Sequence, residues 1–334
     1  MTSGTSSVHR ATTHRPDPGL VALGEVRTGL LQHSAAIPHQ LAERILQLVP
    51  GERVRLSQRP IAHALSPELM AGVDCRLAAA SGTHIDGTGT VLTRASITGG
   101  TVVQASARAV VGPARADHRL PWSHYMARPG MIETRGKIEV DDLAAGFIGQ
   151  PTSSSALDLS ALSRRMMDVI QGSSQLDHAP RMRTKRTRLR WTARTVTAEQ
   201  PHGLVEFAIE DDVLRTLQLR TKIDRIAMVA SLCENLALHD WLLSTLLELI
   251  EREQRGAPHA PQAVLRLRPA IDSLLHLWMP AAHIDESLHP VWEALERRAG
   301  FTRQWEQLRD RIRDQVTLSA VTLMSVVTEG SASE

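Results

Sequence analysis

The sequence predicts an α+β protein, with a sheet-rich N-terminal half and a helical bundle in the C-terminal half. Between residues 88 and 110, two stretches alternate apolar with polar or small residues on either side of Gly99-Gly100, which is the pattern of a β-hairpin. From Ile223 onward, apolar residues recur every three or four positions, as they do in amphipathic helices. A small antiparallel meander is expected to precede the bundle.

The chain divides by composition into four parts. Residues 1–19 are rich in Ser, Thr, Pro and His and predict a disordered tail. Residues 20–150 form the predicted sheet-rich domain, and residues 151–330 the meander with its helical bundle. Residues 331–334 are again expected to be disordered.

In the first half we expect a strand over 21–31, then a helix that starts at Pro38 and ends before Pro50-Gly51. A second strand is expected over 53–57, and a short helix with Ser66 as its N-cap. The hairpin strands cover 88–97 and 101–110, and a loop follows at 120–130.

In the second half, residues 149–157 predict a linker and residues 157–170 a helix. Strands at 204–209 and 213–220 complete the meander. A helix from Pro261, interrupted or restarted at Pro269, should end at Pro280. Further helices are expected over 288–298 and from Phe301 to about Val327.

The most apolar segment, residues 232–250, predicts a core helix packed on more than one side. Its predicted inward stripe includes Leu243 and Leu247, while Glu234 and Trp241 are placed on the opposite side. Because several charged and polar residues interrupt the run, we do not expect it to span a membrane.

The net charge of +2 gives no global basic field of the kind that marks many nucleic-acid-binding proteins. Only Cys75 and Cys233 are present, too few for a disulfide framework, and the N-terminus has no apolar signal segment. We therefore expect a cytoplasmic protein. The sequence holds no phosphate-binding glycine loop and no Gly-x-Ser-x-Gly nucleophile motif, so no catalytic residue is assigned and no cofactor is expected.

Two segments carry candidate binding residues. In the loop at 120–130, Trp122, His124, Tyr125 and Arg128 combine aromatic and cationic groups. They are interpreted either as a binding surface or as a plug for the sheet edge.

The second segment is the basic run at 181–194. Arg186, Arg188 and Arg190 alternate with other residues at strand spacing, so their guanidiniums should project from one face, with Trp191 available for stacking. This pattern suits a nucleic-acid or anionic-ligand site, or else a charged edge strand that resists aggregation.

His239-Asp240 is the most suggestive polar pair. It is interpreted as a buried histidine satisfied by hydrogen bonds, or as a metal or acid–base site. The dipeptide resembles the centre of the HD phosphohydrolase pattern, which would imply a metal-dependent hydrolase. The nearest upstream histidine, His202, falls in a predicted turn and not on a helix, so the match is poor.

Several strings resemble a family of actinobacterial proteins of about this length that has no established activity. They are GVDCRL at 72–77, LPWSHYMARPG at 120–130, RTRLRW at 186–191, LALHDWLLSTLLELIE at 236–251, LLHLWMP at 274–280 and GFTRQW at 300–305. The resemblance implies a component of a multi-gene system that includes a variant P-loop protein. Together with the apolar helices, it favours a non-enzymatic interaction component that binds a protein partner or forms a homo-oligomer.

Overall fold

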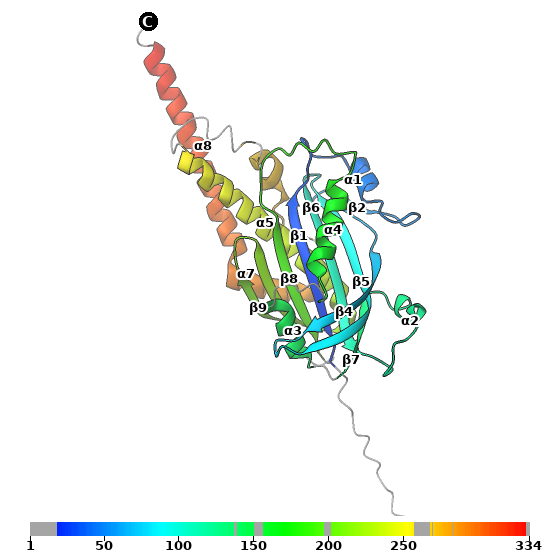
Figure 1. Cartoon of the computed structure of the whole chain (residues 1–334). Coiled ribbons are helices and arrows are strands. Elements are labelled where there is room, and N and C mark those ends of the chain that lie inside the picture. Colours follow the sequence, from blue (N-terminus) through cyan, green and yellow to red (C-terminus); the bar gives the residue numbers. More distant parts are fainter. Residues whose placement is uncertain are drawn as a thin grey trace, which may run out of the picture.

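The computed structural model describes residues 19–136, 139–149, 156–196, 202–256, 268, 270–282 and 284–331. Across these residues, ten strands form one mixed sheet with helices on both faces (Figure 1). The strand order is β2-β3-β5-β7-β6-β1-β8-β10-β9. The tenth strand, β4, is not part of this linear order and pairs with β5. The α+β class predicted from the sequence is confirmed.

The strands are β1 (Val21–Leu30), β2 (Arg55–Ser57), β3 (His63–Leu65), β4 (Leu69–Ala78), β5 (His84–Thr98), β6 (Val102–Pro113), β7 (Met131–Arg135), β8 (Thr187–Thr195), β9 (Gly203–Ile209) and β10 (Leu214–Thr221). The helices are α1 (His39–Leu46), α2 (Trp122–Met126), α3 (Val140–Gly149), α4 (Leu159–Gln171), α5 (Ile226–Gly256), α7 (His289–Ala299) and α8 (Phe301–Ser331).

The predicted hairpin is present as β5 and β6, joined through Gly99 and Gly100. Both glycines have positive φ values, of +59° and +62°. A Cβ on Gly100 would lie 2.3 Å from the carbonyl oxygen of Ile37, so the turn has room only for glycine there.

Strand β1 lies in the middle of the sheet, between β6 and β8. The sheet is therefore continuous across the boundary near residue 150 that the sequence predicts. Strands β9 and β10 form the expected antiparallel pair, but β10 pairs with β8 in parallel. The prediction of a fully antiparallel meander was therefore wrong. After β8 the chain first forms β9 at the edge of the sheet, and β10 then fills the position between β9 and β8.

Alternation along β1 assigns its residues to two faces of the sheet. Ala22 and Val26 belong to the core beneath α5, α7 and α8. Val21 and Leu23 belong to a core on the opposite face, where α3 and α4 pack (Figure 1). A third apolar cluster lies under α1 and the C-terminal part of α4.

Three local predictions are corrected by the structure. Ser66 does not cap a helix, because its hydroxyl accepts a hydrogen bond from the Ala95 backbone N–H and β4 begins three residues later. Trp241 is fully buried and donates to the Lys185 carbonyl, at 2.9 Å. Leu247 was expected in the core, yet 42% of it is exposed.

Helix α5 is buried on almost all sides, as predicted for a core helix. By length and composition alone, the segment Ile223–Arg252 is apolar enough to cross a membrane, and among the described residues it is the one helix with that property. Within the fold, 78% of its most apolar stretch is buried, as in the core helix of a soluble protein.

The predicted N-terminal tail lies outside the described residues up to position 18, as does most of the predicted linker, residues 150–155. Most of the helix expected from Pro261, residues 261–267 and 269, and the last residues, 332–334, are outside them as well. The expected helices at 288–298 and 301–327 are present as α7 and α8.

Candidate interaction groove and a buried arginine band

A groove of about 740 Å³ lies between the β9–β10 hairpin and helices α5 and α8. Its walls come from segments far apart in the sequence, which pack together on the α5 face of the sheet. The lining residues are Phe207, Ile209, Arg215, Asp240, Leu243, Ser244, Leu247, Arg298, Ala299, Phe301, Gln304, Gln307, Leu308 and Arg311.

Large apolar side chains are exposed at this groove. Ile209 ends the edge strand β9 and is 62% exposed, and Leu247 on α5 is 42% exposed. Beneath them, Leu243, Phe301 and Leu308 are buried. Exposed leucine and isoleucine side chains around a deep groove are typical of a surface that another molecule covers.

A buried ion pair forms part of the groove floor. One carboxylate oxygen of Asp240, Oδ2, lies 2.9 Å from Nε of Arg215. Arg215 also donates to Ser244 Oγ and to the Asp211 carbonyl. Burial raises the pKa of Asp240 above its ordinary value, and Arg215 opposes that shift without cancelling it. Arg215 is therefore the charged partner that favours the ionised form of Asp240.

The charged residues that line the groove are mainly cationic. Arg215, Arg298 and Arg311 line it together with one aspartate, Asp240. Arg298 also donates to the Val205 carbonyl of β9, at 3.0 Å, which fixes α7 against this strand. The groove thus combines an apolar lining with arginine side chains.

His239 and Asp240 are adjacent in sequence but have different partners. The Nδ1 atom of His239 lies 2.8 Å from the Asn235 carbonyl, and Nε2 accepts from the Met279 N–H at 3.3 Å. The imidazole also packs edge-on against Trp278. Across the part of the chain that the structure describes, no three His, Cys, Asp or Glu side chains gather in a way that could hold a metal ion.

The candidate residues of the basic run are divided among three environments. Arg190 is buried, Arg188 is half-buried, and Arg186 precedes β8, is exposed and pairs with Asp168 at 3.3 Å. Trp191 is buried on the α5 face, where it lies against Gly24. The alternation is confirmed, but β8 is an internal strand, so the edge-strand interpretation was wrong.

A charged band crosses the opposite face of the sheet, between its two apolar clusters. It consists of Glu25 and Arg27 on β1 and of Arg188 and Arg190 on β8. The register places Glu25 directly opposite Arg190, and Arg27 directly opposite Arg188. Opposite charges across a strand pair stabilise it, whereas like charges destabilise it.

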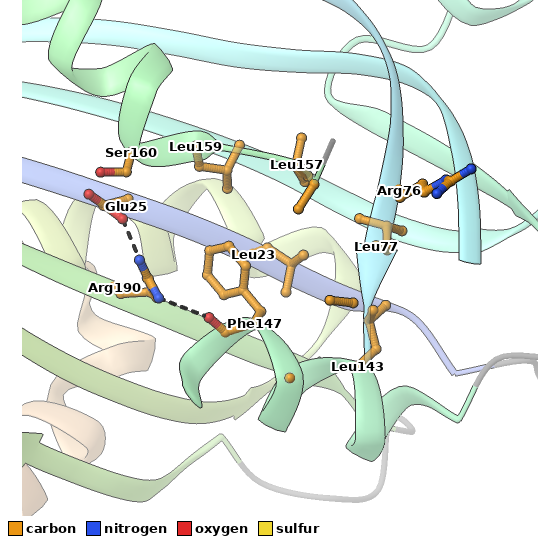
Figure 2. Close-up of a pocket in the computed structure, with 13 residues that line it drawn as sticks. Leu23, Glu25, Arg76, Leu77, Leu143, Phe147, Leu157, Leu159, Ser160 and Arg190 are labelled. Carbon is orange, nitrogen blue, oxygen red and sulfur yellow. Dashed lines mark hydrogen bonds and ion pairs between the residues drawn. The ribbon is translucent and has the colours of Figure 1, made fainter. Parts of the chain in front are cut away.

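Glu25 neutralises only one of the three arginines. Its Oε2 atom lies 3.4 Å from Nε of Arg190, and its Oε1 atom lies 3.6 Å from Arg27 and 4.0 Å from Arg188. Arg190 also donates to the Phe147 carbonyl on α3, at 3.2 Å. Figure 2 shows Glu25, Arg190 and Ser160 together at one end of a cavity whose other walls are apolar except for Arg76.

The volume of this cavity decides what it can hold. The volume open to the centres of water molecules is about 40 Å³. One water molecule needs roughly 10–15 Å³ of such volume. A few water molecules fit, which would satisfy the Glu25 Oε1 atom that has no hydrogen-bond partner. The cavity is too small for a ligand, whereas the groove is in the usual size range of binding sites.

Two guanidiniums converge on Ser160 in the first turn of α4. Arg27 Nη2 lies 2.5 Å from the Ser160 hydroxyl oxygen and Arg188 Nη1 lies 3.4 Å from it. Two like charges that share one hydrogen-bond acceptor repel each other, and burial strengthens the repulsion because the surroundings are less polar than water. Burial lowers the pKa of Arg27, Glu25 opposes this, and Arg188 and Arg164 lower the pKa further.

The candidate loop at 120–130 contains α2, which is attached to β7 through a buried carboxylate. Glu133 lies 3.0 Å from Nε2 of His124 and also pairs with Arg128. Tyr125 is buried and its hydroxyl accepts from the Leu120 N–H, whereas Trp122 is 43% exposed. Three of the four candidates therefore hold the loop in place, and Trp122 alone of these four faces solvent to a large extent.

Sequence reasoning missed the residues that make the groove. Ile209 and Arg215 belong to strands that were read only as parts of a meander, and Leu247 was assigned to the core. The segment VALGEVRTGL at 21–30 places Glu25 and Arg27 inside an otherwise apolar strand. This pattern could have predicted that the two residues form a buried charged cluster. No family model, no curated protein and no solved structure matches this chain.

Proposed function

We propose that this protein is a non-enzymatic interaction component that binds a partner protein in the groove between β9–β10, α5 and α8. The observation that carries the proposal is the 740 Å³ groove itself, in which Ile209 and Leu247 are exposed above an apolar lining. The resemblance to components of a multi-gene system supports a protein partner, because such components are expected to act together.

The lining chemistry defines the occupant as an amphipathic segment with an apolar face and acidic residues at its flanks. The apolar face would cover Leu243, Leu247 and Ile209, as in other helix-in-groove complexes. The acidic residues would pair with Arg298, which lines the groove. A strongly basic segment would lack this pairing.

Affinity capture with matched variants tests the proposal. We expect the tagged wild-type chain to capture a protein from its own cells after nuclease treatment, and Leu247→Glu to lose it. The matched control is Val169→Glu, because Val169 is 55% exposed on α4, on the opposite face of the sheet. A charge at the centre of the interface should weaken binding on the order of tenfold or more, since central contacts often contribute 2 kcal/mol or more.

The bound segment of the captured protein is then made as a synthetic peptide and titrated into each variant. Tight binding of an apolar, acidic peptide to the wild type and to Val169→Glu, with loss in Leu247→Glu, supports the proposal. Equal binding to all three proteins, or capture of nothing by the wild type, overturns it. Both variants should retain the wild-type melting temperature, because each residue is exposed.

A further inference from the structure

The band of Glu25, Arg27, Arg188 and Arg190 carries more positive charge than its surroundings balance. Arg164 on α4 is close enough to lower the pKa of Arg27, and Asp158, the N-cap of α4, acts in the opposite direction. With Asp211, whose pKa is lowered by hydrogen bonds and also by Arg188, there are four arginines and three carboxylates, so one positive charge remains in excess. This site lies on the opposite face of the sheet from the groove.

The strand register makes the excess costly. Arg27 and Arg188 stand directly opposite each other on β1 and β8, where like charges destabilise a sheet. Glu25 is shared with Arg190, its nearest partner. A sequence that keeps such a conflict in a partly buried position commonly does so at a functional site.

The arginines are open to solvent on one side. The side chain of Arg27 is 13% exposed and that of Arg188 is 27% exposed, and Arg164 is exposed on the first turns of α4. Arg27 and Arg188 share the Ser160 hydroxyl and, at 3.6 and 4.0 Å, the Oε1 atom of Glu25. An anion that arrives from this side meets three guanidiniums before it meets the buried Glu25.

We propose that Arg27, Arg164 and Arg188 form a binding site for the phosphate group of a small phosphorylated compound. Guanidiniums bind phosphate oxygens through paired, charge-assisted hydrogen bonds, and the cluster holds more arginines than carboxylates. The bound anion relieves the repulsion between Arg27 and Arg188. The site is independent of the groove and of the partner proposed there.

Thermal unfolding of the full-length protein with sodium pyrophosphate tests this site. Sodium chloride of equal ionic strength is the reference, because salt alone screens the arginines. Saturating pyrophosphate should raise the melting temperature by about 2–8 °C, since a ligand at 100 times its dissociation constant stabilises the folded state substantially. Inorganic phosphate and a nucleoside diphosphate, tested in parallel, show whether the phosphate group alone is recognised.

Three arginine variants locate the effect. Arg188→Gln and Arg164→Gln should lose most of the pyrophosphate shift, whereas Arg165→Gln removes the same charge from the same helix and should keep it. Without anion, Arg188→Gln should melt at the wild-type temperature or above it, because it removes the like-charge pair. Arg164 is exposed, so its variant remains informative even if Arg188→Gln is poorly folded.

Two results would overturn the proposal. One is a wild-type protein that pyrophosphate does not stabilise beyond the chloride reference. The other is a shift that stays equal in Arg164→Gln, Arg165→Gln and wild type. Binding of duplex DNA that is lost in Arg188→Gln, without any response to pyrophosphate, would reassign the site to a nucleic-acid backbone.

Discussion

Gly24 is a single position on which the packing of β1 depends. Its partner across the strands is Trp191, whose indole ring lies directly over the glycine. A Cβ at position 24 would be 2.2 Å from Cε2 of that ring, well inside van der Waals contact. Trp191 is 1% exposed and packed in the core under α5, so it has no space to move.

We therefore expect Gly24→Ala to destabilise the protein by about 1–3 kcal/mol, the usual cost of overpacking a core. Gly149→Ala is the control, because nothing lies within 4 Å of the added Cβ. Urea unfolding followed by tryptophan fluorescence measures both free energies. Equal stabilities of the two variants would contradict the close contact between Gly24 and Trp191.

At the residue scale, the sequence predicted the local structure correctly where a residue type has few possible roles. Gly99-Gly100 predicted its turn correctly because a tight hairpin needs positive φ. His239 is buried with both ring nitrogens in hydrogen bonds, which agrees with the first of its two interpretations. The partner of Asp240, Arg215, comes from β10, 25 positions earlier in the sequence. Pairing between such distant residues leaves no local pattern.

At the scale of elements, α5 is attached to the sheet by a buried ion pair. Glu234 accepts from Nε and Nη2 of Arg94, on β5, at 2.8 and 2.7 Å, and from the Ser106 hydroxyl on β6 at 2.6 Å. Burial by itself raises the pKa of Glu234, but the Arg94 charge and these hydrogen bonds outweigh it, so the pKa lies below its ordinary value.

We expect Glu234→Gln to lower the free energy of unfolding by up to about 3–5 kcal/mol at pH 7, because it leaves the buried Arg94 with only its more distant carboxylate, Glu68, at 3.7 Å. A carboxylate with a lowered folded-state pKa stabilises the fold above its unfolded-state pKa. This contribution is lost as the pH falls through the folded-state pKa. The difference between wild type and variant should therefore be constant above about pH 6 and shrink below about pH 4.3, the ordinary glutamate value.

Urea titrations from pH 7 to pH 3 measure this difference. Glu206→Gln is the matched control: Glu206 is an exposed carboxylate on β9 that accepts from Gln218, and its loss should change stability by less than about 0.5 kcal/mol. If Glu234→Gln were as stable as Glu206→Gln at pH 7, the attachment of α5 through Arg94 would be disproved.

Element positions were predictable where the pattern is local. The helices α4, α7 and α8 and the strands β5 and β6 lie within a few residues of their predicted bounds, because periodicity within one segment defines them. The exposure of Leu247 was not predictable, since it depends on where α8 and the β9–β10 hairpin pass α5. Apolar residues on α5 recur at the same helical spacing whether they face the core or a groove, so the spacing cannot distinguish the two.

At the scale of the whole molecule, β1 joins the two predicted halves. It pairs with β6 on one side and with β8 on the other, so the first strand of the chain is placed by segments up to about 170 residues away. Sequence patterns could give the α+β class but not this pairing, because strand order is set by contacts between distant segments. The groove and the arginine band both depend on it.

The fold thus presents two surfaces on opposite faces of one sheet. The groove lies on the α5 face and the arginine band under α3 and α4 (Figure 1). The central claim is that the groove holds a partner protein, and the residue that tests it best is the most exposed one in its lining. Among the large apolar residues of the lining, that is Ile209, at 62% exposed.

The most direct measurement is photo-crosslinking in the native cell, with a photoreactive amino acid in place of Ile209 in one strain and Val169 in another. The account predicts a discrete crosslinked protein band from position 209, mapping to an apolar segment with acidic flanks, and none from position 169. A chain that crosslinks to nothing at position 209, or to the same proteins from both positions, would contradict the proposed interaction groove.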